Sequence, residues 1–476
     1  MRAEDCERCR EVLPELEKLR AENACLKAEQ LRLTKLVEEL REKAGLNSQN
    51  SSLPPASDRP DAPVRIAKPP TGRKPGGQPG HPRHERTLLP PEKVTRTLVF
   101  KPPKCRACGC VLLGDDPRPQ RWQHVEIPEP KPEVTECEQH TLECLNCQER
   151  TTASVPDWAP RGPWGVRLLA TMALLVGGNR QSRRLVVSLM KDLFGIAISL
   201  GSVSASEKTV SAAIAKPVEE AVRHVQEAAI KNADETSWKE GAKRLKVWLW
   251  VAYTAQVTVF KIQASRSEEA ARNFLGKVLG ILVTDRLASY NWWPLWLRQV
   301  CWSHLKRDFQ KIVDRGGESL RIGEALQAKR TQLFLWWHRI RDGTLSRATF
   351  GRYVAELRQE VKTLLLQGSV CSHPKTARTC AKLLQIEPAL WTFVRVPGVE
   401  PTNNSSERAV RPAVIMRKLC FGSHSPDGSR FVERMLTVIT SLRQQDRDVL
   451  GYLMGAIKAA QENRAAPSIL PAHRTA

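Results

Sequence analysis

Two aspartates in this 476-residue chain are the side chains best suited to metal-dependent chemistry. Asp234 lies in the segment NADETSWKEG, and Asp285 ends the apolar run of GILVTDRLASY. Two carboxylates a few ångströms apart repel and raise each other's pKa, and a divalent cation reverses this effect. Mg²⁺ prefers carboxylate and water oxygens as ligands. Two such ions can activate the attacking oxygen and stabilise the leaving oxygen when a phosphodiester is cleaved.

The elements around these aspartates explain how the two side chains would meet. Three β-rich runs joined by short turns come first: NADETSWKEG, RLKVWLWVAYTA and VTVFKIQAS. Ser265 and Glu268 form a predicted capping box that opens a helix to about Val278, and the strand GILVTD follows. The order β-β-β-α-β is that of an RNase H-like core, in which the first and fourth strands are neighbours. Asp234 and Asp285 are therefore expected on adjacent strands.

A third acid should complete the metal site from a helix beside the sheet, and Glu407 in EPTNNSSERAVRPAVIMRK is the best candidate. On a helix, Asn403, Glu407 and Arg411 share one face. The spacing of Asn404 and Glu407 also matches a capping box, in which the glutamate only folds back on its own helix start. Spacing alone does not decide between the two roles. Pro412 is expected to kink or end this helix.

The cysteines predict a structural zinc site. The N-terminus MRAEDCERCR has no apolar signal segment, so a reducing cytosol is expected, where thirteen cysteines do not form a disulfide framework. Two tight pairs supply four thiolates, which suit tetrahedral Zn²⁺: Cys105, Cys108, Cys144 and Cys147. The alternative is buried cysteines without a ligand.

Residues 11–45 are predicted to form one helix with a leucine-zipper pattern. Leucine recurs every seven residues, at Leu19, Leu26, Leu33 and Leu40. Such heptads favour a coiled coil, and hence a homo-oligomer. The alternative is an amphipathic helix packed on its own chain.

The charge of the chain favours a polyanionic partner. It has 74 Lys and Arg against 51 Asp and Glu, a formal net charge of +23, and such a surface gains affinity by displacing counterions from phosphates. Residues 59–104 hold 11 prolines, 11 Lys and Arg and 3 acids, so an extended basic linker is expected. Its run RKPGGQPGHPRH, with Arg73 and Lys74, either follows a phosphate backbone or only keeps the linker soluble.

Two further regions are predicted to be helical. Residues 156–230 alternate apolar runs with basic clusters, as a helical DNA-binding region would. The 121 residues between Asp285 and Glu407 are too many for a loop and show helical periodicity, which predicts a helical insertion in which Trp336 and Trp337 are core residues. No segment reaches the ~20 apolar residues of a membrane helix, and a cytoplasmic, nucleoid-associated protein is expected.

These motifs together resemble the insertion sequence 66 family of bacterial transposases, which are DDE-type enzymes. The resemblance covers nearly the whole chain and is most specific in ADETSW, LVTDRLASY, CWSHLKRDF and TNNSSERAVRP. It implies that Asp234, Asp285 and Glu407 are the catalytic triad. One departure is Gln148, which stands where a glycine commonly follows the second cysteine pair.

The resemblance also implies roles for residues around the triad. His304 and Arg307 match a motif after the second aspartate, near the active site. Asn403, Asn404, Arg408 and Arg411 match the motif around the glutamate. In a transposase the cationic side chains of this helix would neutralise DNA phosphates: Arg408, Arg411, Arg417 and Lys418.

The predicted fold is a multidomain α+β protein with an RNase H-like catalytic core, a mixed sheet with flanking helices. In chain order the regions are a leucine-zipper coiled coil (1–46), a basic Pro-rich linker (47–104), a β-rich zinc-binding domain (105–155), a helical DNA-binding region (156–230), the first part of the core (231–308), the helical insertion (309–398), the second part of the core with the Glu407 helix (399–460) and a tail (461–476).

The predicted function is Mg²⁺- or Mn²⁺-dependent strand cleavage at terminal inverted repeats, followed by strand transfer into target DNA. Two divalent ions and a structural Zn²⁺ are the expected cofactors. The expected partners are double-stranded DNA (element ends and target), further copies of the chain and helper proteins of the same element. The alternatives are a catalytically inactive DNA-binding protein derived from a transposase, and an RNase H-like nuclease without strand transfer.

Overall fold

The computed structural model describes residues 7–44, 46–47, 49–50, 86–156, 158–160 and 162–471. The chain divides into two units, Pro63–Glu133 and a larger unit made of Met1–Ala62 and Val134–Ala476. Each unit is described by itself.

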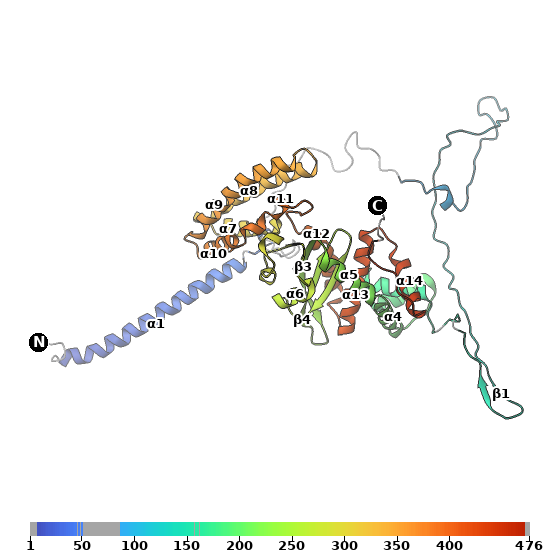
Figure 1. Cartoon of the computed structure of the whole chain (residues 1–476), viewed down its shortest axis with the longest axis horizontal. Helices are drawn as coiled ribbons and strands as arrows, with labels where there is room; N and C mark the ends of the chain where they lie inside the picture. The colour runs from blue at the N-terminus through green and yellow to red at the C-terminus, as the bar shows by residue number, and fades with distance from the viewer. Residues whose placement is uncertain are drawn as a thin grey trace. The chain divides into compact units, whose positions relative to one another are not determined.

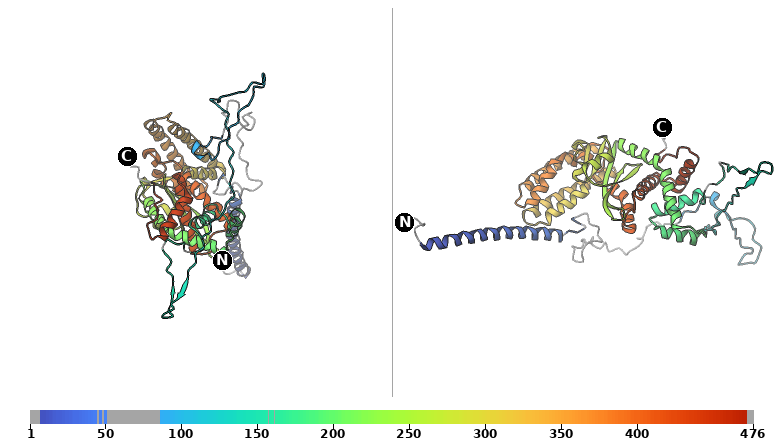
Figure 2. Two further views of the ribbon diagram at one scale, coloured as in Figure 1. Left: turned by 90° about the vertical axis from the view of Figure 1, so that its right-hand side faces the viewer. Right: turned by 90° about the horizontal axis from the view of Figure 1, so that it is seen from below.

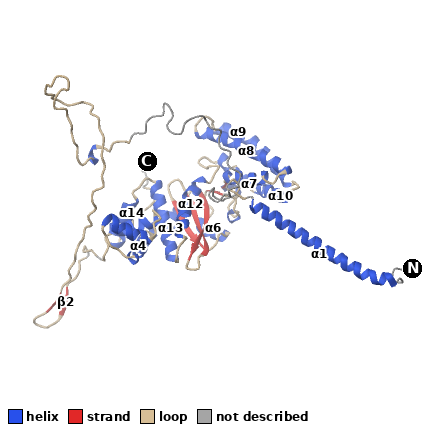
Figure 3. Cartoon of the chain, turned by 180° about the vertical axis from the view of Figure 1, so that it is seen from behind, coloured by secondary structure: helices blue, strands red, loops and turns tan. Residues whose placement is uncertain are grey.

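A five-stranded mixed sheet forms the centre of the larger unit (Figures 1 and 3). Its strands are β3 (Ile230–Glu240), β4 (Leu245–Tyr253), β5 (Thr258–Gln263), β6 (Ile281–Thr284) and β7 (Arg298–Val300). The order across the sheet is β5-β4-β3-β6-β7, with β5, β4 and β3 antiparallel and β3, β6 and β7 parallel. The predicted strand order is confirmed, and the sheet is consistent with an RNase H-like core.

Helix α6 (Glu268–Leu275) connects β5 to β6, but it begins at a different cap from the one predicted. Ser267 is the N-cap residue, and its hydroxyl accepts from the Ala270 N–H at 3.2 Å. Ser265 instead contacts the Ser267 hydroxyl. The helix ends at Leu275 because Gly276 takes a positive φ of 72°, so the predicted end at Val278 is also wrong.

Helix α13 (Pro426–Gln444) covers the β5 edge of the sheet. Alternate N–H groups of β5 would lack strand partners, and three α13 side chains at four-residue spacing accept them. Thr258 N–H donates to Ser441 Oγ at 3.0 Å, Phe260 N–H to Thr437 Oγ1 at 3.0 Å, and Ile262 N–H to Glu433 Oε1 at 2.5 Å. One helix thereby satisfies the backbone of an edge strand.

Helix α12 (Asn404–Cys420) packs on β3 and β4. It continues through Pro412 to Cys420, so of the two effects predicted for that proline, a kink or an end, the end is wrong. Helices α5 (Ala215–Glu227) and α13 contact each other and β5, and all of these elements share one hydrophobic core with the sheet.

The segment between Asp285 and Glu407 is mainly helical, as predicted (Figure 2). Its helices share a second hydrophobic core with Ile281 and Val283 of β6 and Val300 of β7. Its helices are α7 (Trp302–Val313), α8 (Gly317–Arg341), α9 (Arg347–Ser369), α10 (Pro374–Gln385) and α11 (Thr392–Arg395). Trp337 lies against Phe350 and Phe393, and Trp336 lies against Tyr353. Both tryptophans are packed side chains, as predicted.

The helical region before the sheet also follows the prediction. It contains α2 (Val166–Gly177), α3 (Arg183–Phe194), α4 (Leu200–Ala213) and α5. Helices α2 and α4 pack against α13 and α14 (Val449–Gln461), so this region is continuous with the core of the sheet. Short 3-10 helices occur at Pro91–Lys93, Ala288–Tyr290, Leu295–Leu297 and Glu387–Leu390.

Helix α1 (Glu7–Ala44) confirms the predicted N-terminal helix. Its heptad leucines are exposed, from 51% at Leu33 to 71% at Leu26. A row of exposed leucines is unusual on a surface that contacts water. The coiled coil that would cover these leucines stays a prediction. None of the helices in the described ranges is long and apolar enough to cross a membrane.

The cysteine-rich segment is less β-rich than expected. In the described part of residues 105–155, only β1 (Thr141–Glu143) and β2 (Arg150–Thr152) are strands, and they form one antiparallel pair. The prolines of the intervening PEPKPE run lack the N–H groups that a strand ladder needs.

The α13–β5 contacts predict a specific loss of stability. Thr437→Val keeps the side-chain volume but removes the acceptor of the buried Phe260 N–H. We expect a loss of about 1–3 kcal/mol in the free energy of unfolding, measured by denaturant titration. Thr209→Val on the exposed surface of α4 is the matched control and should change little. Equal effects of the two substitutions would contradict this account of the sheet edge.

Candidate active site

The parallel pairing of β3 with β6 determines where the two aspartates lie. The register pairs Asn232 with Val283, and β6 ends one residue later. Two residues beyond this pair, Asp234 and Asp285 come at the same level of the two strands. As expected, Asp234 lies on β3 and Asp285 directly follows the neighbouring strand β6.

Neighbouring acids act on the pKa of Asp234. Burial is the largest cause that raises the pKa of Asp234 well above its usual value, and the charges of Glu235, Asp285 and Glu407 raise it further. One hydrogen bond, from the Glu235 N–H to Asp234 Oδ1 at 2.9 Å, acts in the opposite direction. A cation at this position would relieve the repulsion among these groups.

Asn403 fixes the start of α12 beside Asp234. Its side chain is fully buried. Asn403 Nδ2 donates to the Ala233 carbonyl at 2.7 Å, and Asn403 Oδ1 accepts from Asn232 Nδ2 at 2.9 Å. This amide is used entirely within the protein, which is at odds with the DNA contact predicted for it.

The capping alternative for Glu407 is wrong because α12 begins one residue earlier than that alternative requires. Asn403 is the N-cap residue, and its backbone N–H donates to Cys301 Sγ at 3.1 Å. Glu407 turns instead toward α7, where its Oε1 lies 3.4 Å from His304 Nδ1. Neither of these two atoms, both buried, has a hydrogen-bond partner in the part of the chain that the structure describes.

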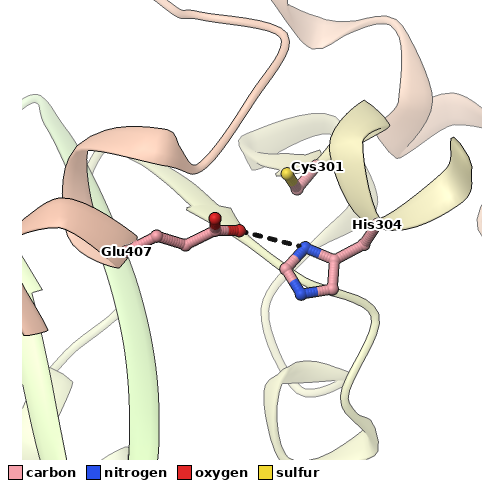
Figure 4. A group of neighbouring side chains, drawn as sticks. All are labelled: Cys301, His304 and Glu407. Carbon is pink, nitrogen blue, oxygen red and sulfur yellow. Dashed lines mark ion pairs between the residues drawn. The ribbon is translucent and has the colours of Figure 1, made fainter. Parts of the chain in front are cut away.

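The tightest group of ligand-type side chains is therefore not the acidic triad. Across the described ranges, one set of three such residues has its ligand atoms within 4.8 Å of one another: Cys301, His304 and Glu407 (Figure 4). The carboxylates of Asp234, Asp285 and Glu407 do not converge to that degree. His304 and Glu407 were predicted from the sequence but Cys301 was not, although CWSH places cysteine and histidine three residues apart at a helix start.

One buried and one partly buried arginine hold the loop after β6. Arg298 Nη2 donates to the Asp285 carbonyl at 3.0 Å, and burial lowers the pKa of Arg298 to about 10. Arg286 forms a bidentate pair with Asp308, at 2.5 and 2.9 Å. Asp285 Oδ1 accepts from the Leu287 N–H at 2.9 Å. The Asp285 side chain is thus fixed at the end of its strand.

Glu235 is a second buried acid that the sequence analysis did not single out. Tyr290 donates its hydroxyl to Glu235 Oε2 at 2.8 Å, and Arg266 lies 3.6 Å from Oε1. Burial and then the charge of Asp285 raise the pKa of Glu235 to about 7. The ADET motif could have revealed Glu235. Two adjacent acids on a predicted buried strand need hydrogen-bond donors or cations to offset their charges.

Helix α12 presents one exposed basic stripe, defined by Asn404, Arg408, Arg411 and Lys418. Their spacing of four, three and seven residues keeps them on one face. Arg417 lies on another face and donates to Thr236 Oγ1 at 3.0 Å and Ser237 Oγ at 2.6 Å. Arg417 therefore binds β3, and its predicted phosphate contact stays a prediction.

His304 and Arg307 lie partly buried at the start of α7. Burial lowers the pKa of His304, and the Arg307 charge lowers it further. The nearby carboxylates of Asp285 and Glu407 act in the opposite direction. The neutral imidazole can then act as a metal ligand or hydrogen-bond acceptor.

Both cysteine pairs form turns with the same hydrogen bonds. Cys105 N–H donates to the Cys110 carbonyl at 2.8 Å and Gly109 N–H to the Cys105 carbonyl at 2.9 Å. In the second turn Cys144 N–H donates to the Glu149 carbonyl at 2.9 Å and Gln148 N–H to the Cys144 carbonyl at 2.8 Å.

Gln148 does not disrupt the second turn. It takes a left-handed φ of 59°, where Gly109 takes 75° in the first turn.

Amide N–H groups of Cys108 and then Ala107 lower the pKa of Cys105, and those of Cys147 and then Asn146 lower the pKa of Cys144. Thiolates are favoured in both turns, which suits a metal ligand. The two turns belong to different units. Arg73 and Lys74 lie outside the described residues.

Comparison with known proteins gives a family. The model described as "Transposase IS66 family" matches residues 161–430, more than half of the chain. A second model, described as a family of unknown function, matches residues 8–87. An uncharacterized protein, y4qI of Sinorhizobium fredii (strain NBRC 101917 / NGR234), is 25% identical over 255 residues. That match covers 46% of this chain and 46% of the relative, so the chain spans about half the length of y4qI.

The raised pKa of Asp234 predicts how stability depends on pH. A carboxyl whose folded pKa exceeds its unfolded pKa destabilises the folded state as the pH rises from the unfolded value through the folded one, by about 1.4 kcal/mol per unit. Metal-free Asp234→Asn should therefore melt at a higher temperature than the wild type above the usual aspartate pKa of 3.8. The difference should vanish in stronger acid.

Added Mg²⁺ should reverse this order, because only the wild type gains a carboxylate ligand. Differential scanning calorimetry across pH measures both effects, with Glu219→Gln on the exposed face of α5 as the control. A metal-free variant that is less stable than the wild type at every pH would refute the proposed repulsion.

Proposed function

Because this chain belongs to the IS66 family of transposases, we propose that it cleaves DNA strands at the ends of its element and joins them to target DNA. The observation that carries the proposal is the juxtaposition at the end of the β3–β6 pair. The register of β3 with β6 brings Asp234 and Asp285 to the same level, and the start of α12, which carries Glu407, bonds to β3 directly before Asp234. The charges of Asp285 and Glu407 both act to raise the pKa of Asp234.

Asp234, Asp285 and Glu407 are the proposed holders of two Mg²⁺ or Mn²⁺ ions. Their oxygens are the ligand type that these ions prefer, and their mutual repulsion fits a site built for positive charge. When bound, the ions would supply Lewis-acid activation of the attacking oxygen and stabilisation of the leaving oxygen.

The proposed reaction has two steps at phosphorus. Water first hydrolyses a phosphodiester at the terminal inverted repeat and frees a 3′-hydroxyl. This 3′-hydroxyl then attacks a target phosphodiester in line and displaces the target strand's own 3′-oxygen. The protein positions the reacting groups. Asn403 fixes the start of α12, and with it Glu407, relative to β3, and Arg298 binds the backbone carbonyl of Asp285.

The exposed basic stripe of α12 would bind the DNA backbone beside the site. Arg408, Arg411 and Lys418 face solvent at helical spacing, which suits successive phosphates. Asn404 shares this face, and His304 and Arg307 border it from α7. In this proposal Asn403 and Arg417 position α12 rather than contact DNA.

The N-terminal regions would recognise and pair the element ends. The two cysteine turns would hold one structural Zn²⁺, and the basic linker with Arg73 and Lys74 would follow phosphates. The exposed leucines of α1 would form a coiled coil with a second copy. We also propose that helper proteins of the same element take part. The protein would act in the cytoplasm, on the DNA of the nucleoid.

Removal of one carboxylate charge should separate chemistry from binding. Asp285→Asn and Glu407→Gln should abolish Mg²⁺-dependent cleavage of an inverted-repeat substrate, while binding in a gel-shift assay survives. Glu219→Gln is the control and should cleave normally. Cleavage retained by both site variants would end the assignment of the triad.

A second assay with pre-cleaved ends separates the other functions. Joining to target DNA supports a transposase. Cleavage without joining indicates a nuclease, and binding without either step indicates an inactive descendant.

The cysteine turns predict about one Zn²⁺ per chain that depends on both pairs. Elemental analysis should find this zinc in the wild type, and Cys144→Ser should lose it because three thiolates hold the ion less well than four. Cys25→Ser in α1 is the matched control. Zinc content unchanged by Cys144→Ser would contradict the site.

A further inference from the structure

We propose that Cys301, His304 and Glu407 form a binding site for a divalent cation of the Zn²⁺ class, which overlaps the carboxylate site through Glu407. The overlap rests on the proposed function, whereas the site itself rests on geometry and ligand chemistry. The three side chains come from the end of β7, the first turn of α7 and the first turn of α12 (Figure 4).

The ligand types select the ion. A cysteine sulfur, an imidazole nitrogen and a carboxylate oxygen are the ligands of Zn²⁺ and similar borderline ions, and three protein ligands with one open position are typical of reactive zinc sites. Mg²⁺ would not choose sulfur and nitrogen. This trio and the acidic trio therefore differ in the metal that they prefer, although they share a glutamate.

The separation of the His304 and Glu407 ligand atoms fits such an ion. Two ligand atoms that each lie about 2.0–2.1 Å from a tetrahedral Zn²⁺ are about 3.3–3.4 Å apart. His304 Nδ1 and Glu407 Oε1 are 3.4 Å apart, and Cys301 Sγ lies within 4.8 Å of both. Figure 4 shows the imidazole and the carboxylate pointing toward one another, with the sulfur beside them.

The two buried atoms are also left without hydrogen bonds. Within the described ranges neither His304 Nδ1 nor Glu407 Oε1 has a hydrogen-bond partner, although both atoms are shielded from solvent. Buried polar atoms without a partner are uncommon and costly. A shared cation would satisfy both.

Surrounding contacts hold the ligands in place. Cys301 and His304 are three residues apart at the start of α7 and so share a face. The Asn403 N–H donates to Cys301 Sγ at 3.1 Å, and the Cys301 N–H donates to the Thr284 carbonyl at 2.8 Å. Such outer contacts orient metal ligands. The partly exposed side chains of His304 and Glu407, at 19% and 34%, leave a path for the ion.

Sharing of Glu407 makes the two metal sites compete. An ion held by Cys301 and His304 would draw Glu407 away from the Asp234 side, so Zn²⁺ would inhibit a reaction that Mg²⁺ supports. The cysteine and histidine then make the enzyme sensitive to zinc.

The binding test uses Co²⁺ as a spectroscopic probe of the full-length, metal-free chain. We expect the wild type to bind about one more equivalent than Cys301→Ser, with weaker sulfur-to-cobalt absorption in the variant. His304→Gln should also bind about one equivalent of Co²⁺ less than the wild type. Because this variant keeps every cysteine, it still tests the site if Cys301→Ser folds poorly. Cys420→Ser, on the last turn of α12, is the matched control and should bind as the wild type does. Equal cobalt binding by the wild type and His304→Gln would overturn the site.

The competition test measures cleavage at fixed Mg²⁺ with increasing Zn²⁺, each variant compared with its own Mg²⁺-only rate. Zn²⁺ should inhibit the wild type at least tenfold more strongly than Cys301→Ser. Equal inhibition would overturn the overlap. If Mg²⁺ alone supports no cleavage by the wild type, the proposed function and the overlap fail together, while the cobalt result still decides the metal site.

Discussion

The buried amide of Asn403 is the contact on which the arrangement of the site depends. It joins α12 to β3 at Asn232 and Ala233, directly before Asp234. Loss of a partner would leave buried polar groups unsatisfied, at a cost of about 1–3 kcal/mol each, so this register of helix against strand is strongly favoured. Nearby, the Trp302 N–H donates to the Pro401 carbonyl, which ties the chain entering the insertion to the chain leaving it. The helical insertion can therefore extend from the core without displacing Glu407 from the strand that carries the first aspartate.

Local sequence was sufficient for elements whose signals are local. The runs that became β3, β4 and β5 are β-rich and separated by short turns, and a buried strand ending in Asp285 follows from its apolar run. Choices that depend on distant partners were not predictable. The helix start at Ser267 instead of Ser265, and at Asn403 instead of Asn404, differ by one or two residues that local spacing cannot resolve. Asn403 and Arg417 read as DNA contacts because their partners on β3 are more than 160 residues away. Cys301 was overlooked for the same reason, since only the fold brings Glu407 to it.

The site brings several acidic side chains together, and each of them has different neighbours. Asp234 is partly buried beside other acids, and Glu235 is partly compensated by Tyr290 and Arg266. Glu407 lies beside Cys301 and His304, and its charge also acts on the pKa of Asp234. In the proposed sites, a hard ion would hold Glu407 with the two aspartates, and a softer ion would hold it with Cys301 and His304. The proposed competition would thus couple the identity of the bound metal to the position of one side chain.

Helix α12 combines these roles because it is anchored to β3 at both ends. Asn403 binds the strand at Asn232 and Ala233, and Arg417 binds it at Thr236 and Ser237. Two anchors on the same strand prevent the helix from rotating about its axis, so helical periodicity alone assigns the remaining positions. Ala409, Val410 and Ala413 then face the core, Glu407 faces His304, and Arg408, Arg411 and Lys418 face solvent. A rotation by one residue, about 100°, would bury a cation and expose the glutamate. The anchors therefore couple the direction of the carboxylate to the direction of the proposed DNA-binding surface.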